Sequence, residues 1–294
     1  MHSEYGKLKE VWLGRAYSPD VVSDDFVKQI LTETEEDLQA LSNTLTGMGV
    51  EVKRPNYKVD DNFIAGRFPQ LLHPRDQLQL INGKLYIGAD YEEDIDRWTE
   101  LLGGRLPHIT LDNLNASSIL RGDKCYIDAN GISRDRALYI KNANPEIDFI
   151  YDPMSSRGFD NNKHTDGVFT IIKEGVIIST PQGRNLETIF PNWDILYLDH
   201  TDRDLRDLAD SKKILWSPDQ IPVEYRRWVG YSPETFFDIN TLTVDSDNVL
   251  VTRYNQKVFE FLQKHKVAPH IIPLRHRYLW DGGLHSLTFD YARG

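Results

Sequence analysis

The sequence predicts an α/β fold in which five strand–turn–strand–helix–strand units close on themselves as one propeller-like domain over residues 1–294. Four segments share one plan: an apolar strand, a tight turn, a second strand, a helix and a closing strand. They begin at the polar residues Asp76, Asn115, His164 and Asn240. A looser fifth copy opens the chain. Its strands and those of the other copies are short and mostly apolar, as expected where both faces of a sheet are covered.

The individual elements follow from local patterns along the chain. In the opening copy we expect a strand at 9–14, a helix at 24–47 and a strand at 50–55, because leucines 38, 41 and 45 recur at helical spacing. The later copies have hairpin turns at 81–84, 121–124, 173–175 and 245–248, and helices at 91–103, 133–142, 184–190 and 255–266. An insertion at about 200–239 accounts for the longest interval between copies.

Units arranged in this way direct one strand end of each copy toward a common axis. Residues that are far apart in the chain can then share one pocket. The alternative is an open doubly wound sheet, which usually carries a glycine-rich phosphate-binding motif. No GxGxxG follows an expected strand here and no GxxxxGK[ST] occurs, so we favour the closed arrangement.

Composition narrows the function classes. The chain has 34 Lys and Arg against 45 Asp and Glu, and the net charge of −11 argues against nucleic acid as a partner. The balance suits a cationic small substrate, although many proteins are this acidic for solubility alone. No apolar run approaches the roughly 20 residues of a membrane span, and the N-terminus lacks a signal-peptide pattern. The single cysteine, Cys125, fits a reducing compartment and a buried mid-strand position, so we expect a cytoplasmic protein.

Two segments carry residues suited to chemistry. His164 and Asp166 are separated by one residue, and on a strand their side chains would point to the same face. A histidine beside carboxylates can act as a general base or a metal ligand, or can be an ordinary surface residue. The segment from Asp281 to Thr288 has a Gly-Gly turn before His285 and Ser286, where glycine permits a tight bend.

These motifs resemble those of a known family. His164 to Phe169 reads HTDGVF, Pro74 to Asp76 reads PRD, and Asp281 to Thr288 reads DGGLHSLT. In their order along the chain, PRD, HTDGVF and DGGLHSLT, they are similar to motifs of the arginine:glycine amidinotransferases and arginine deiminases, members of the guanidine-modifying pentein superfamily. Residues 233–240, PETFFDIN, resemble the amidinotransferase branch. The resemblance covers nearly the whole chain and implies a five-unit pseudo-symmetric α/β propeller, the pentein fold, without a cofactor.

The resemblance implies a role for several residues. Asp76 and Asp166 would clamp the planar guanidinium of an arginine-like substrate by forked hydrogen bonds. His164 would protonate the departing amine and then activate the second nucleophile. Ser286 stands where the family has a nucleophilic cysteine, whose thiolate takes the amidino group and passes it to an amine such as glycine. In deiminases water accepts the group.

The sequence departs from the family pattern at three places. A serine hydroxyl at Ser286 needs stronger general-base help than a thiol, and we do not expect His285 to supply it because adjacent strand residues face opposite sides. The acidic motif that supports the catalytic histidine falls on residues 115–118, so Asn115 and Ser118 replace carboxylates. The carboxylate-binding arginine aligns with Gly183, one residue before Arg184, which we take as its substitute.

Three hypotheses follow. The first is an amidinotransferase acting on arginine or a related guanidino compound, with turnover weak or lost because of Ser286. The second is a guanidine hydrolase or deiminase. The third is an inactive pentein that binds a guanidino ligand or serves as a scaffold. Ser286 is open to two explanations, natural loss or deliberate replacement of a cysteine, and loss of acid at Asn115 and Ser118 favours the former.

Other features indicate less. Aromatic residues in the insertion, Trp216, Tyr225, Trp228 and Tyr231, suit a lid, an oligomer surface or, more simply, a decorated surface loop. The acidic run at 91–96 suits a solvated helix start. The histidines at 265, 270 and 276 lack metal-ligand spacing, so we expect no metal site. A homodimer remains open.

Overall fold

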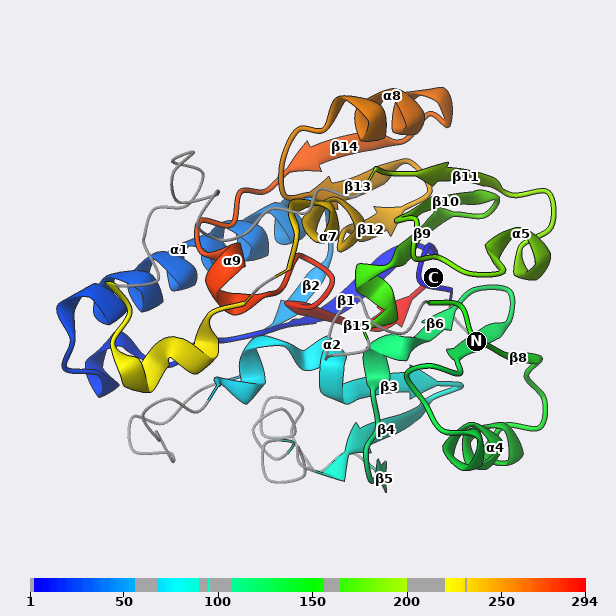
Figure 1. Cartoon of the computed structure of the whole chain (residues 1–294), viewed down its shortest axis with the longest axis horizontal. Coiled ribbons are helices and arrows are strands. Elements are labelled where there is room, and N and C mark those ends of the chain that lie inside the picture. Colours follow the sequence, from blue (N-terminus) through cyan, green and yellow to red (C-terminus); the bar gives the residue numbers. More distant parts are fainter. Residues whose placement is uncertain are drawn as a thin grey trace.

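The part of the chain that the structure describes forms five three-stranded sheets arranged around one axis (Figure 1). This computed structural model describes residues 3–55, 68–89, 95, 107–155, 164–199, 220–230 and 232–294. The sheets are β15–β1–β2, β3–β4–β5, β6–β7–β8, β9–β10–β11 and β12–β13–β14. The predicted five-unit α/β propeller is therefore confirmed.

All five sheets have the same pairing: two antiparallel strands, then a third strand parallel to the second. The strands are β1 (Leu8–Leu13), β2 (Glu51–Lys53), β3 (Leu78–Ile81), β4 (Lys84–Gly88), β5 (His108–Leu111), β6 (Ile119–Arg121), β7 (Cys125–Asp128), β8 (Phe149–Asp152), β9 (Phe169–Lys173), β10 (Val176–Ser179), β11 (Asp194–Tyr197), β12 (Leu242–Asp245), β13 (Asn248–Val251), β14 (Ala268–Ile271) and β15 (Thr288–Arg293). The helices that link second and third strands are α1 (Asp25–Gly47), α4 (Arg134–Ala143), α5 (Leu186–Ile189) and α8 (Gln256–Lys264). They lie at the periphery of the propeller (Figure 1).

The two ends of the chain complete one unit together. β15 pairs antiparallel with β1, so that Val11 lies opposite Asp290 and Leu13 opposite Thr288. The looser opening copy lacks a first strand of its own, and the C-terminal strand supplies it. This pairing closes the ring of sheets.

Local sequence explains most of the elements. The side chain of Asp24 caps α1 by accepting a hydrogen bond from the amide of Val27 at 2.9 Å. The buried face of α1 includes Leu38, Leu41 and Leu45 at helical spacing. The β3–β4 turn has Asn82 and Gly83 at φ of +49° and +73°, the conformation of a type I′ hairpin.

A short helical turn precedes four of the inner strands, and the polar residue that begins each copy lies in this turn or directly beside it. The turns are α2 (Pro74–Gln77), the 3₁₀ turns η4 (Ala116–Ser118) and η5 (Thr165–Gly167), and α7 (Glu234–Ile239). The expectation that His164 and Asp166 lie on a strand was therefore wrong. Strand β9 begins only at Phe169, and one helical turn sends their side chains in different directions.

The centre of the propeller holds buried charges. The carboxylate of Asp290 contacts the guanidinium groups of Arg75, Arg121 and Arg293. Glu4 adds a second carboxylate, 3.8 Å from both Arg75 and Arg121. Burial alone would raise the pKa of Asp290, but the three arginines hold this pKa well below its ordinary value. The centre is therefore held by opposite charges as well as by apolar contacts.

Several sequence-based expectations concern segments that the structure does not describe. The helix expected at 91–103 and its acidic start at 91–96 lie outside the described residues, except Ile95, which is buried. Residues 200–219 of the insertion, including Trp216, also lie outside them, as does Tyr231.

Candidate active site

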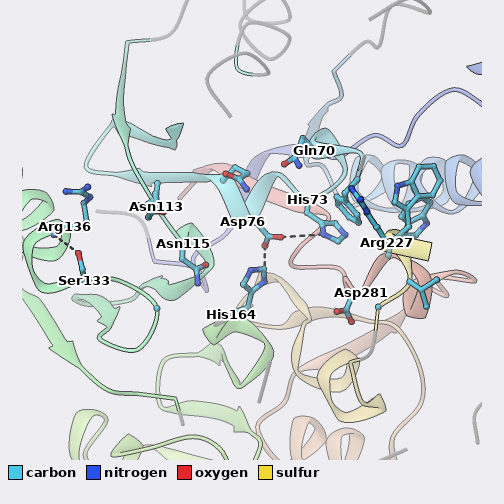
Figure 2. A pocket seen from close by; sticks show the side chains of 18 residues that line it. Gln70, His73, Asp76, Asn113, Asn115, Ser133, Arg136, His164, Arg227 and Asp281 are labelled. Atoms are coloured by element: carbon cyan, nitrogen blue, oxygen red, sulfur yellow. Dashed lines mark hydrogen bonds and ion pairs between the residues drawn. The ribbon is translucent and has the colours of Figure 1, made fainter. Parts of the chain in front are cut away.

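A cavity of about 840 Å³ is lined by segments that precede three inner strands, together with residues of η7 (Val223–Trp228) and α9 (Arg277–Trp280). Asp76, Asn115 and His164 all line it, although they belong to three different units (Figure 2). The sequence-based expectation that distant inner-strand ends share one pocket agrees with this arrangement.

Asp76 lies between two imidazoles in the cavity (Figure 2). Its Oδ1 is 3.5 Å from Nδ1 of His164, and its Oδ2 is 3.6 Å from Nδ1 of His73. These are ion-pair distances rather than hydrogen-bond distances. The Asp76 side chain keeps 17% of its exposure, so the carboxylate can meet a cation in the cavity. His73 directly precedes the PRD motif, and that adjacency was the only sequence signal for it.

The turn that follows His164 is held in position by Asp128, a residue that the sequence analysis missed. Thr165 follows it on η5 and donates a hydrogen bond from Oγ1 to Oδ2 of Asp128 at 2.7 Å. Asp128 ends β7, is fully buried, and also accepts from the amide of Met154 at 3.1 Å. The buried carboxylate therefore fixes η5 relative to the neighbouring unit.

Asp166 does not line the cavity. Its Oδ2 accepts hydrogen bonds from Nδ2 of Asn240 at 3.1 Å and lies 2.7 Å from Nδ1 of His285. Burial raises the pKa of Asp166, but the hydrogen bond and charge of His285, with smaller contributions from His164 and Arg75, lower this pKa overall. The second carboxylate of the expected guanidinium clamp is thus engaged by an internal histidine.

Ser286 is also buried and does not line the cavity. Its Oγ donates to Oδ1 of Asn240 at 3.2 Å, and its amide donates to the same oxygen at 3.0 Å. Strand β15 begins at Thr288, so His285 and Ser286 lie in the preceding turn and not on a strand as expected. Their side chains nevertheless contact different residues: His285 contacts Asp166, whereas Ser286 contacts Asn240.

The remaining predicted residues divide between the cavity and its surroundings. Asn115 directly precedes η4 and lines the cavity, and its Oδ1 accepts from Oγ of Ser117 at 2.8 Å. Ser118 is fully buried and does not line it. Arg184 is exposed on the surface outside the cavity. A side chain at Gly183 would begin 2.3 Å from Oγ of Ser179, so the aligned position has no room for an arginine.

Two arginines that sequence reasoning missed line the cavity instead. Arg136 comes from α4 and Arg227 from η7, within the insertion. Neither belongs to a recognisable motif. The only signal for Arg227 was its place in the aromatic part of the insertion, where the sequence analysis considered the aromatic residues and not the arginine.

The described part of the insertion is not a decorated surface loop, so that expectation was wrong for Tyr225 and Trp228. Both are buried, and the Trp228 ring packs 5.2 Å from that of Trp280. The amide of Gly230 donates to the carbonyls of Tyr278 and Leu279 at 3.1 and 3.0 Å. Within this segment, Arg227 to Gly230 form a wall of the cavity.

The Gly-Gly pair at 282–283 provides room rather than a special backbone conformation. Asp281, not either glycine, has the positive φ, at +54°. A Cβ on Gly282 would begin 2.3 Å from Nε2 of His73, and one on Gly283 would begin 2.7 Å from the carbonyl oxygen of Asn240. The two glycines thus let the C-terminal turn lie close to His73 in the cavity and to the backbone of Asn240.

Gly283→Ala is expected to destabilise the protein by about 1–3 kcal/mol, because the backbone of Asn240 cannot move aside as a flexible side chain would. Thermal and denaturant unfolding measure the change. Gly47→Ala is the matched control: it ends α1, no atom lies within 4 Å of its added Cβ, and stability should stay equal or rise. Equal stability of the two variants would contradict the close approach.

Three further expectations concern features outside the cavity. Cys125 is buried in β7, as predicted, and burial raises the pKa of its thiol. Within the described residues, no cluster of three or more His, Cys, Asp or Glu could hold a metal ion. In the same part of the chain, no helix combines the length and apolar character needed to cross a bilayer.

The chain is similar to known amidinotransferases over its whole length. It is 22% identical to the inosamine-phosphate amidinotransferase of Streptomyces glaucescens and 21% identical to that of Streptomyces griseus, covering 100% of this chain and 96% of each relative. Its homologues are amidinotransferases. The chain matches no protein-family model.

Solved structures share the fold. The S. griseus amidinotransferase has a TM-score of 0.72 at 16% identity, and SxtG, a Microseira wollei amidinotransferase of saxitoxin biosynthesis, has 0.70 at 14%. Both alignments cover 100% of this chain and 96% of the amidinotransferase. The N-terminal domain of ArgZ, a cyanobacterial arginine dihydrolase, has a TM-score of 0.65 at 13% identity, and the alignment covers 97% of this chain and 98% of that domain. That domain was solved as a Cys-to-Ser variant with substrate bound. The fold is the pentein fold of the amidinotransferases.

Proposed function

We propose that the cavity is an amidinotransferase-type site that binds arginine or a related guanidino compound. The observation that carries the proposal is the meeting of Asp76 and His164, from two separate units, in one cavity. A guanidinium is planar and always charged, so a partly exposed carboxylate is a suitable partner. The names of the homologues support the same reaction class. In our proposal the acceptor is an amine such as glycine.

The proposed chemistry assigns His164 the proton transfers. A nucleophile would attack the guanidinium carbon, the carbon–nitrogen bond to the donor amine would break, and His164 would protonate that amine. The acceptor amine would then lose a proton to His164, attack the amidino carbon and release the nucleophile. No described base accepts a hydrogen bond from Ser286, whose hydroxyl donates to the amide oxygen of Asn240. We therefore expect turnover to be weak or absent.

The second candidate is a guanidino-binding protein without turnover. The position of Ser286 favours it, because the hydroxyl is buried beside Asn240 and does not line the cavity. The Cys-to-Ser variant of ArgZ with substrate bound shows, for that protein, binding in the presence of such a replacement. Asp76 and His164 would serve the ligand equally in either case.

Calorimetry with L-arginine and a product assay separate these candidates. We expect saturable binding of L-arginine. Guanidinoacetate and ornithine formed from arginine and glycine would select the transferase, citrulline or urea would select a hydrolase, and binding without product would select the non-catalytic protein. No binding of any guanidino compound would contradict the proposed site.

Ser286→Cys alone is expected to give little turnover, because Asn115 can orient the imidazole of His164 but cannot stabilise imidazolium by charge. Asn115 directly precedes η4 and His164 directly precedes η5, and these two turns pack against each other. Combining Ser286→Cys with Asn115→Asp should raise the transfer rate by about 100-fold over Ser286→Cys. Asn115→Asp alone is the control and should stay inactive. Full turnover by Ser286→Cys alone would show that only the nucleophile was missing.

A further inference from the structure

The cavity extends to both sides of Asp76, and each side carries an arginine (Figure 2). Arg136 lies on the side of Asn115, and Arg227 lies on the side of His73. If the cationic head of a guanidino substrate lies at Asp76, its other end extends toward one of these two guanidinium groups. The contacts that each arginine already makes distinguish them.

Arg136 is already engaged. Its Nε donates to the carbonyl of Asp112 at 3.1 Å, and its Nη2 lies 3.7 Å from the carboxylate of the same residue. The guanidinium of Arg227 forms no hydrogen bond or ion pair with another residue in the described part of the chain. A guanidinium keeps its charge at every physiological pH and has five N–H donors. Arg227 therefore offers the cavity a charge that no described carboxylate neutralises.

The backbone that carries Arg227 is fixed before any ligand binds. Its neighbour Trp228 is buried against Trp280, and two residues later the amide of Gly230 donates to the carbonyls of Tyr278 and Leu279. Arg227 itself remains exposed. A charged group on such an anchored turn loses little freedom when it binds an anion, which favours affinity.

We infer that Arg227 binds the anionic end, a carboxylate or a phosphate, of the substrate whose guanidinium lies at Asp76. The inference rests on the proposed function and adds its substrate class: guanidino compounds with an anionic group at the opposite end. It also replaces the sequence-based candidate Arg184, which lies outside the cavity. Arg227 is a positioning residue and takes no part in bond making.

Calorimetry with paired ligands tests this inference. L-arginine has a carboxylate, agmatine is the same guanidino amine without it, and guanidinoethyl phosphate has a phosphate instead. Arg227→Ala should weaken binding of the preferred anionic ligand by about 10- to 100-fold and leave agmatine unchanged. Arg227→Lys should be intermediate because it retains the charge but not the fork. Whichever of L-arginine and guanidinoethyl phosphate binds more tightly identifies the anionic group, carboxylate or phosphate, that Arg227 binds.

Arg226→Ala is the matched control, because Arg226 is the adjacent exposed arginine and does not line the cavity. It should leave all three affinities unchanged. Equal loss of agmatine and L-arginine binding in Arg227→Ala, no loss of either, or a selective loss in Arg184→Ala would overturn the inference while leaving the proposed function intact. If the unaltered protein binds none of the ligands, the proposed function and the inference both fail.

Discussion

Asp76→Asn is expected to weaken the binding of L-arginine by about 100-fold, since the amide keeps the shape of the carboxylate but removes the charge that meets the guanidinium. Asp166 cannot compensate, because it is buried and bonded to His285 and Asn240. Calorimetry on the folded variant measures the change, and far-ultraviolet circular dichroism confirms the fold.

Asp199→Asn provides the control for this substitution. Asp199 is exposed and pairs with Lys257 in another unit, so its loss should leave arginine binding unchanged. If Asp76→Asn binds arginine as tightly as the unaltered protein does, Asp76 is not the guanidinium partner. In that case Asp281, which among the described residues is the other carboxylate that lines the cavity, would be the next candidate.

Asp290→Asn is expected to lower the free energy of unfolding by about 3–5 kcal/mol, because three buried arginines lose their common counter-ion. Urea unfolding measures the change, and Asp199→Asn should leave stability unchanged within error. A loss no larger than that of the exposed control would contradict the structural role of the central charges.

The buried charge of Asp290 also predicts that the stability of the protein depends on pH in the acid range. The pKa of Asp290 is lowered on folding, so its contribution is present above the pKa of an unfolded aspartate, about 3.9, and is lost as the pH falls below that value. The unaltered protein should therefore lose stability steeply below about pH 4, whereas Asp290→Asn should lack this part of the pH dependence. Parallel pH dependences of the two proteins would contradict the assignment.

Most of the fold could be predicted because its signals are local. Each hairpin is encoded by two short apolar runs around a turn, such as Asn82–Gly83, and α1 has its cap and its leucine face in consecutive residues. The pairing of β1 with β15 could not be predicted in this way. It joins Val11 to Asp290, at opposite ends of the chain, and neither segment specifies its partner locally.

The candidate site could be predicted in part. The motifs placed Asp76, His164 and Asn115 near one pocket, and all three line the cavity. The orientation of Asp166 was missed because one 3₁₀ turn, η5, replaces the expected strand and reverses which neighbours share a face. Arg227 was missed because its position depends on how the insertion packs against α9, which no motif records.

Comparing L-arginine with L-citrulline tests the central claim most directly. The two have nearly the same shape, but citrulline has a neutral urea group in place of the charged guanidinium. If Asp76 and His164 form a guanidinium site, L-arginine should bind saturably and citrulline at least about 10-fold more weakly. Equal affinities, or no binding of L-arginine at any concentration, would contradict the account.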